Sequence, residues 1–244
     1  VRGQALQYCG EGRTPEQDGC MEKTEIVALP RGIKAGHLYA DRDRGVIWFN
    51  DACGKCLASL DPASDAKVTA YELGDKHDGP LEGMPGMGGM PWKLEVDHAA
   101  VYSGEYATRH ILRMDKGSGA WSEVRLPYDN PDVRLHSLAL EATRNRLWFT
   151  LANEVSSPIN PAASTIGYID LDSWQAHVEA PDRNPRIRGV IYRGFEGIAP
   201  RDDRGFMHHS FRGIAVDPVS GKIALATMLR EQITVLTPLP GFFP

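Results

Sequence analysis

Apolar and polar positions alternate along this chain in short segments, and the segments recur in one order. An apolar segment that ends in an acid is followed by a turn, a second apolar segment and then a third. The order occurs at 38–61, 138–170 and 214–236, and in a weaker form at 94–115. Alternation with a period of two over so few residues predicts β-strands with one buried face, joined by short turns.

Repeats of short strands with a period of roughly 40 to 50 residues are typical of β-propeller blades. The sequence therefore predicts an all-β fold, a β-propeller of four-stranded antiparallel blades, with four or five blades in this chain. We expect a single domain over 1–244, with blades at 31–74, 86–127, 131–180 and 190–240. The last blade has no apolar segment after Leu236 that would supply its outer strand.

Residues 1–30 are expected to form a hairpin with a closing strand, because 24–29 alternate like an outer strand that has no blade before it. Pairing of 24–29 with 232–236 would complete the last blade and leave no open sheet edge there. The alternative is that the chain is part of a larger propeller. Val1 is not a natural initiator, which favours this alternative, and four repeats would make a small ring.

Charge and composition narrow the classes of partner. The 27 basic and 32 acidic residues give a net charge of −5, without the broad basic field that holds phosphates, so we do not expect nucleic acid as a partner. No apolar run approaches the roughly 20 residues that span a bilayer, and the N-terminus has no apolar signal core. We expect a protein partner or a small molecule.

The four cysteines fall into two close pairs. Cys9 and Cys20 flank a loop between two strand-like segments, and Cys53 and Cys56 stand at a turn. Two local disulfides are one interpretation, and a zinc site made from these thiolates is the other. Disulfides would place the protein in the periplasm or outside the cell, because the bonds persist in oxidising compartments.

Pairs of residues align at the start of the first strand of each repeat, where propellers present side chains to the central channel. They are Gly36-His37, Trp92-Lys93, His136-Ser137 and Phe211-Arg212, with His208 and His209 just before the last pair. Imidazoles near one another bind Zn, Cu or Fe, or act as a general base near neutral pH. The alternative is that these side chains only hydrogen-bond to backbone or water.

From this alignment we predict a ligand-binding set at the channel. Its members are His37, Trp92, Arg212, His208 and His209. The predicted metal ligands are His37, His136 and His209, and a divalent metal is the cofactor that such a set would hold. Two further patterns predict structure alone. The acids Asp41, Asp97, Glu141 and Asp217 recur at one position as turn caps, and Trp48 and Trp148 are expected to pack between blades.

Two segments resemble the streptogramin B lyase family: GVIWFND at 45–51 and LWFT at 147–150, each followed by a strand that ends in Asp. The resemblance covers 33–180, and 210–237 more loosely. It implies a β-propeller in which a magnesium-assisted His and neighbouring glutamates open a cyclic depsipeptide by elimination. His136 holds the family's His position and would be the catalytic residue, whereas Arg134 and Leu151 stand where the family has acids.

Because those acids are absent, the sequence favours a noncatalytic, extracytoplasmic module that docks or supports a larger assembly. The alternative is a lyase-like enzyme, or a metal or small-molecule site at the channel mouth. A propeller fold by itself does not choose between these functions.

Overall fold

The computed structural model describes residues 26–51, 56–73, 91–105, 110–126, 133–153, 164–177, 211–227 and 233–237. The chain divides into two compact units, Val1–Gly32 and Ile33–Pro244. In the first unit the described residues 26–32 belong to no strand. The expected closing strand at 24–29 and its pairing with the end of the chain therefore stay a prediction.

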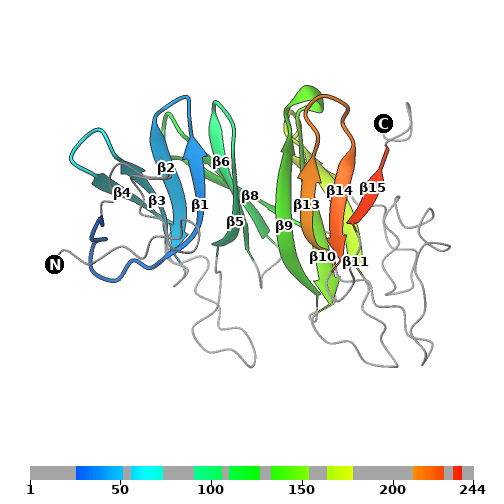
Figure 1. Ribbon diagram of the computed structural model, residues 1–244, viewed down its shortest axis with the longest axis horizontal. Coiled ribbons are helices and arrows are strands. Elements are labelled where there is room, and N and C mark those ends of the chain that lie inside the picture. Colours follow the sequence, from blue (N-terminus) through cyan, green and yellow to red (C-terminus); the bar gives the residue numbers. More distant parts are fainter. Residues whose placement is uncertain are drawn as a thin grey trace, which may run out of the picture. The chain divides into compact units, whose positions relative to one another are not determined.

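The second unit is built from four antiparallel sheets in which consecutive strands pair with one another (Figure 1). Sheet 1 contains β1 (Ala35–Asp41), β2 (Val46–Asp51), β3 (Cys56–Asp61) and β4 (Lys67–Glu72). Sheet 2 contains β5 (Pro91–Val96), β6 (Ala100–Glu105), β7 (His110–Asp115) and β8 (Trp121–Arg125).

Sheet 3 contains β9 (Val133–Glu141), β10 (Arg146–Asn153), β11 (Ser164–Asp170) and β12 (Gln175–His177), with a short 3-10 turn at Ala142–Arg144 between its first two strands. Sheet 4 contains β13 (Phe211–Val216), β14 (Ile223–Thr227) and β15 (Ile233–Leu236). The described part of the chain is thus all-β, and each sheet is a β-propeller blade. Sheet 4 has three described strands, and the third of them ends at Leu236.

Each sheet packs on the next through apolar side chains, and the first strands adjoin in the order β1, β5, β9, β13. We call these packing regions junction 1–2, junction 2–3 and junction 3–4. Junction 1–2 contains Trp48, Leu57, Leu94, Val96, Val101 and Met114. Junction 2–3 is the largest and includes Tyr102, Ile111, Leu126, Leu135, Phe149, Leu151 and Ile169. Junction 3–4 contains Trp148, Ile166, Tyr168, Ile223 and Leu225.

Three sheets repeat one hydrogen bond between the acid at the end of the first strand and an aromatic donor on the second. The Trp48 indole donates to Asp41 at 3.0 Å and the Trp148 indole donates to Glu141 at 2.7 Å. The Tyr102 hydroxyl donates to Asp97 at 2.7 Å. Both tryptophans are buried in a junction, so the predicted packing role is confirmed.

Sheet 4 has no aromatic donor at the equivalent position, because Ala224 stands there. Its acid, Asp217, is exposed and accepts hydrogen bonds from the turn residues Val219 and Ser220. Asp41, Asp97 and Asp217 are therefore turn caps, as predicted. Glu141 differs, because it accepts from the Arg144 side chain and caps no backbone N–H. In sheets 1 to 3 the acid also fixes an aromatic side chain.

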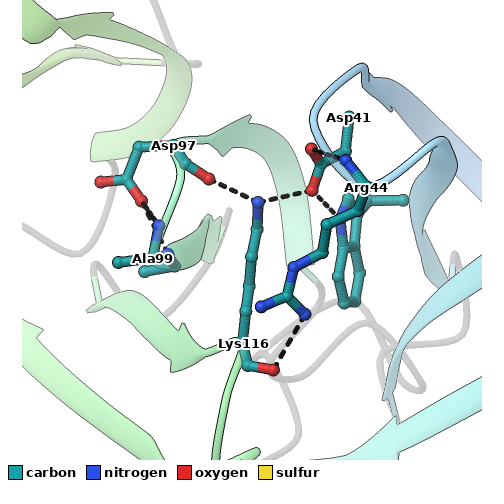
Figure 2. Close-up of polar contacts among 7 residues, drawn as sticks. Asp41, Arg44, Asp97, Ala99 and Lys116 are labelled. Atoms are coloured by element: carbon teal, nitrogen blue, oxygen red, sulfur yellow. Dashed lines mark hydrogen bonds and ion pairs between the residues drawn. The ribbon is translucent and has the colours of Figure 1, made fainter.

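Junction 1–2 also contains a buried ion pair (Figure 2). Lys116, in the turn after β7, donates from Nζ to Asp41 Oδ2 at 2.5 Å and to the Asp97 carbonyl, and the Lys116 and Asp41 side chains are 0% and 4% exposed. Arg44 of sheet 1 also reaches across the junction, and its guanidinium donates to the Lys116 carbonyl of sheet 2 at 3.0 Å. Burial by itself would raise the pKa of Asp41, but the hydrogen bonds from Lys116 and Trp48 outweigh it and lower that pKa.

Candidate functional site

The first strand of each sheet carries a β-bulge near its start. At each bulge the first strand has one residue more than the stretch of the second strand that it pairs with. The extra residues are Trp92 in β5, His136 in β9 and Arg212 in β13, and in β1 Gly36 and His37 together stand against Asn50. A bulge breaks the alternation of a strand and re-aims the side chain it carries, which is why bulges are common beside binding sites.

These bulges fall on the pairs that the sequence aligned, with one correction in sheet 4. Arg212, and not Phe211, is the residue equivalent to Trp92 and His136, because Phe211 pairs with Thr227 and Gly213 pairs with Ala226. A one-residue shift of this kind cannot be seen in the sequence, since the apolar pattern of the strand starts only after the bulge. His208 and His209 lie outside the described residues.

The structure brings two of the predicted ligand-binding residues together. The His37 ring meets the Trp92 ring edge to face, with centroids 5.0 Å apart and an interplanar angle of 78°. The β1 bulge is held by Asn50, whose Oδ1 accepts a hydrogen bond from the His37 backbone N–H at 2.5 Å. A Cβ at Gly36 would lie 2.9 Å from that same oxygen, so the close approach requires glycine.

Burial and a nearby positive charge favour the neutral form of His37. Burial, followed by the positive charge of Lys93, lowers the pKa of His37 below its ordinary value. A neutral imidazole has one donor nitrogen and one acceptor nitrogen, so His37 could serve as a base, a ligand or a hydrogen-bonding group.

His136 is buried in sheet 3, with 4% of its surface exposed, whereas His37 is partly exposed. The predicted catalytic role of His136 stays a prediction. Within the described ranges no group of three or more His, Cys, Asp or Glu side chains could hold a metal ion. The predicted set also included His209, which is not described, so the metal assignment is not supported here.

The cysteine expectations need a correction. Cys56 is a free, buried thiol at the start of β3, paired across the sheet with Glu72, so it is not bridged to Cys53. Burial, helped by the charges of Asp51 and Glu72, raises the pKa of the Cys56 thiol to about 11. Such a thiol is protonated at neutral pH. Cys9, Cys20 and Cys53 lie outside the described residues.

Sequence analysis missed Glu95, which lies on β5 close to the bulge. Burial raises the pKa of Glu95 to about 7, although the backbone N–H of Leu140 and the charge of Lys93 both oppose the rise. A carboxyl that changes charge near neutral pH is a candidate acid or base. The only signal in the sequence was an acid inside an apolar inner strand, which the pattern of strands by itself treats as solvent-facing.

The outer edges of the sheets differ in chemistry. The exposed residues of β4 and β8 include charged side chains, among them Lys67, Glu72, Glu123 and Arg125. In contrast, β15 has the sequence Ile-Thr-Val-Leu and exposes Ile233 and Val235, which are 71% and 58% accessible. Charge on an edge strand discourages pairing with other chains, and β15 lacks this protection. The short outer strand β12 (Gln175–His177) also lacks Lys, Arg, Asp and Glu, but it has no exposed large apolar side chain in the described structure.

No helix in the described ranges is long and apolar enough to cross a membrane. Comparison with known proteins finds no matching family model and no matching curated protein. The resemblance to streptogramin B lyases is therefore not supported by a family match.

Solved structures do match this chain. A chain in the crystal structure of a nidogen/laminin complex aligns with a TM-score of 0.51 and 13% identity, over 83% of this chain and 60% of that chain. Two others score lower. The extracellular domain of a putative one-component system from B. thetaiotaomicron gives 0.47 at 12% identity, over 78% of this chain and 19% of that chain. Glutaminyl cyclase from Myxococcus xanthus gives 0.41 at 12% identity, over 84% and 75%.

This chain thus spans about a fifth of the one-component-system chain and 60% of the nidogen/laminin chain. At such identities a structural likeness shows a fold and not a function. Together with the four sheets, the comparison establishes that this chain has a β-propeller fold.

Proposed function

We propose that this chain is a noncatalytic, extracytoplasmic β-propeller module that docks a protein partner by accepting a strand at β15. The observation that supports the proposal is the uncharged edge of sheet 4, where Ile233 and Val235 are exposed. An open strand presents backbone N–H and C=O groups that an extended segment of another chain can pair with.

The chemistry of the edge indicates the kind of partner. Ile233 and Val235 are two residues apart, so they lie on one face of the strand. A partner strand with apolar residues at alternate positions would extend that face, while its backbone would supply the hydrogen bonds. Affinity would come from main-chain pairing and specificity from the alternate side chains.

Hydrogen exchange with a peptide probe tests this function. The probe is a synthetic peptide with the sequence of residues 23–30, KTEIVALP, which has the alternation that the edge requires. We expect the peptide to slow exchange of the β15 amides and to leave the amides of β4 unchanged. The double substitution Ile233→Lys and Val235→Lys should abolish the effect, and Thr69→Lys on the exposed face of β4 is the matched control.

Two results would overturn the docking proposal. Equal protection of β4 and β15 would show that binding is nonspecific. Slow exchange, before the peptide is added, of those β15 amides that point away from β14 would show that the edge is already paired, as the closing-strand prediction requires.

A second candidate, a small-ligand site at the channel, is favoured by the aligned bulges and by the contact between His37 and Trp92. Lyase chemistry at His136 would need an acid near it, and Arg134 and Leu151 occupy the positions where the family has them. Loss of turnover of a cyclic depsipeptide in a His136→Ala variant would establish this activity. The extracytoplasmic location is tested by the oxidation state of Cys9 and Cys20 in the purified, unreduced protein.

A further inference from the structure

Each of the three junctions joins the back of one sheet to the front of the next. We call the face that packs on the preceding sheet the front face, and the face that packs on the following sheet the back face. The described packing joins sheet 1 to sheet 2, sheet 2 to sheet 3 and sheet 3 to sheet 4. Two faces therefore stand at the ends of this series, the front face of sheet 1 and the back face of sheet 4.

One position on the first strand shows whether another sheet covers the front face. It lies three residues before the acid that ends the strand, in Leu38, Leu94, Leu138 and Ile214. Leu94 and Leu138 are 6% and 4% exposed in junctions 1–2 and 2–3, and Ile214 is partly buried in junction 3–4. Leu38 holds the same position in sheet 1, yet it is 65% exposed.

A position on the third strand shows in the same way whether another sheet covers the back face. It is held by Leu57, Ile111, Ile166 and Ile233, which pair with equivalent residues of the second strand. The first three are buried in junctions 1–2, 2–3 and 3–4 in turn. Ile233 is 71% exposed. Both end faces thus expose a side chain that every described junction buries.

The two end faces are apolar around these positions. Residues that pair across a sheet, or lie two apart along a strand, share one face. On the back face of sheet 4 they are Gly213, Ala215, Ala224, Ala226 and Val235. On the front face of sheet 1 they are Ala40, Ile47, Phe49, Ala58, Leu60, Val68 and Ala70. Phe49 and Ala58 are buried, whereas Ala40 and Ala70 on either side of them are exposed. Exposed apolar surface of this extent marks an interaction site.

The occupant follows from the way the junctions are built. A back face packs on a front face in all three junctions, and this chain leaves one open face of each kind. Leu38 and Ile233 are both exposed, so the two faces do not cover each other within one chain. A contact between unlike faces of identical chains either closes a ring or extends without end. Two copies of four blades would give eight, within the range of roughly four to eight that propellers have, whereas three copies would exceed it.

We propose that two copies of this chain close one ring, in which the back face of sheet 4 in each copy packs on the front face of sheet 1 in the other. Ile233 would then be buried like Ile166, and Leu38 like Leu138. The interface continues the packing of the three junctions. It uses the faces of the sheets, whereas strand docking uses the backbone edge of β15, so this proposal does not depend on the docking function.

Sedimentation velocity of the full chain over a range of concentrations tests the pairing. We expect the wild type to reach twice the mass of one chain and to dissociate on dilution. Leu38→Lys and Ile233→Lys each put a charge into the apolar interface, so each should raise the dissociation constant at least about tenfold. Val219→Lys is the matched control, because Val219 is 92% exposed but lies in the turn between β13 and β14. Circular dichroism should show that all three variants keep the wild-type fold.

A pair of opposite charges tests whether the contact runs from back face to front face. Leu38→Lys and Ile233→Glu should each be monomeric alone, whereas an equal mixture of the two variants should form dimers. In the mixed dimer one junction joins two unaltered faces, and the other brings the two introduced charges, which are opposite, together. Association that survives either substitution, a mixture that stays monomeric, or a mass that keeps rising beyond two chains would overturn the proposal.

A wild-type chain that stays monomeric at every concentration would overturn it as well, and would leave the end faces to a different protein or to another segment of this chain. Strand docking is measured separately, because Leu38→Lys leaves β15 unaltered. The peptide of residues 23–30 should protect the β15 amides of this variant as it does those of the wild type. Loss of the dimer and loss of docking are therefore distinguishable.

Discussion

Junctions 1–2 and 2–3 are built from the same strands in the same order, yet they differ in polarity. Junction 2–3 has an apolar core from Leu171 to Leu135, and beside it the Glu95 carboxyl of sheet 2 accepts a hydrogen bond from the Leu140 N–H of sheet 3. Junction 1–2 has an apolar centre, but a buried ion pair closes one end and the Ser103, Glu105 and His110 group occupies the other. Both junctions therefore combine an apolar core with buried polar groups, but only junction 1–2 has a described ion pair between its two sheets.

At one end the explanation is structural. The position of Lys116 is taken by Leu171 in sheet 3, where it joins the core of junction 2–3. The ion pair thus stands where junction 2–3 has an apolar contact. It holds the turn after β7 against the end of β1. At the other end the Glu105 carboxyl lies 3.5 Å from the His110 imidazole of the same hairpin, so this contact stays within sheet 2.

The largest expected effect is the loss of the ion pair. Lys116→Met leaves Asp41 buried with only the Trp48 indole and the Arg44 backbone as partners, and the free energy of unfolding should fall by about 3 to 5 kcal/mol. Denaturant unfolding measures it. Lys67→Met, at an exposed position on β4, is the control, and equal stability of the two variants would mean that the pair contributes nothing.

The second largest effect should be a pH dependence of the free energy of unfolding. It should come from Glu95, which lies on the face of sheet 2 opposite Ser103 and Glu105. In the unfolded chain Glu95 ionises from its ordinary pKa of 4.5, whereas in the folded protein it stays protonated until about 7. Stability should therefore fall as pH rises from 4.5 to 7, by up to about 3 kcal/mol at ~1.4 kcal/mol per pKa unit. Unfolding at several pH values should show that Glu95→Gln removes this part of the slope. An unchanged slope would mean that Glu95 is solvated.

Overpacking tests junction 2–3 directly. Gly104→Ala places a methyl group against Leu135, and cores that receive extra atoms lose about 1 to 3 kcal/mol. Gly117→Ala, in an exposed turn, should change stability far less. If thermal unfolding finds both variants alike, the close packing of Leu135 on Gly104 is not rigid.

The smallest effect is expected at junction 3–4. Gly221 has a φ of +66°, and a Cβ there would lie 3.2 Å from Glu141 Oε1. Gly221→Ala should therefore cost about 1 to 2 kcal/mol, mostly from the left-handed backbone. Gly221→Asn should cost less, because asparagine tolerates that conformation. Equal melting temperatures for the two variants would place the strain elsewhere.

The apolar alternation predicted the strands well, because burying one face of a strand imposes a period of two on the sequence. It also predicted three consecutive strands for sheet 4, and the described residues form them. What it could not predict was anything that depends on pairing. The bulge in β13 shifted the alignment by one residue, and Cys56 proved to be a strand residue although its neighbours look like a turn.

The candidate site was found in part. His37 and Trp92 were selected because the repeats align there, and the structure places them in contact. Glu105 and His110 were not selected, because an acid and an imidazole five residues apart carry no signal until a hairpin folds them together.

The recurring bulge separates the residues that hold the blades together from the residue that each first strand carries near its start. Because each bulge adds its residue before the paired, apolar part of the strand, the side chain at that position contributes little to the register of the sheet. One backbone geometry accordingly carries glycine, tryptophan, histidine and arginine in the four blades. A propeller of this design can exchange its displayed chemistry one residue at a time while its scaffold stays the same.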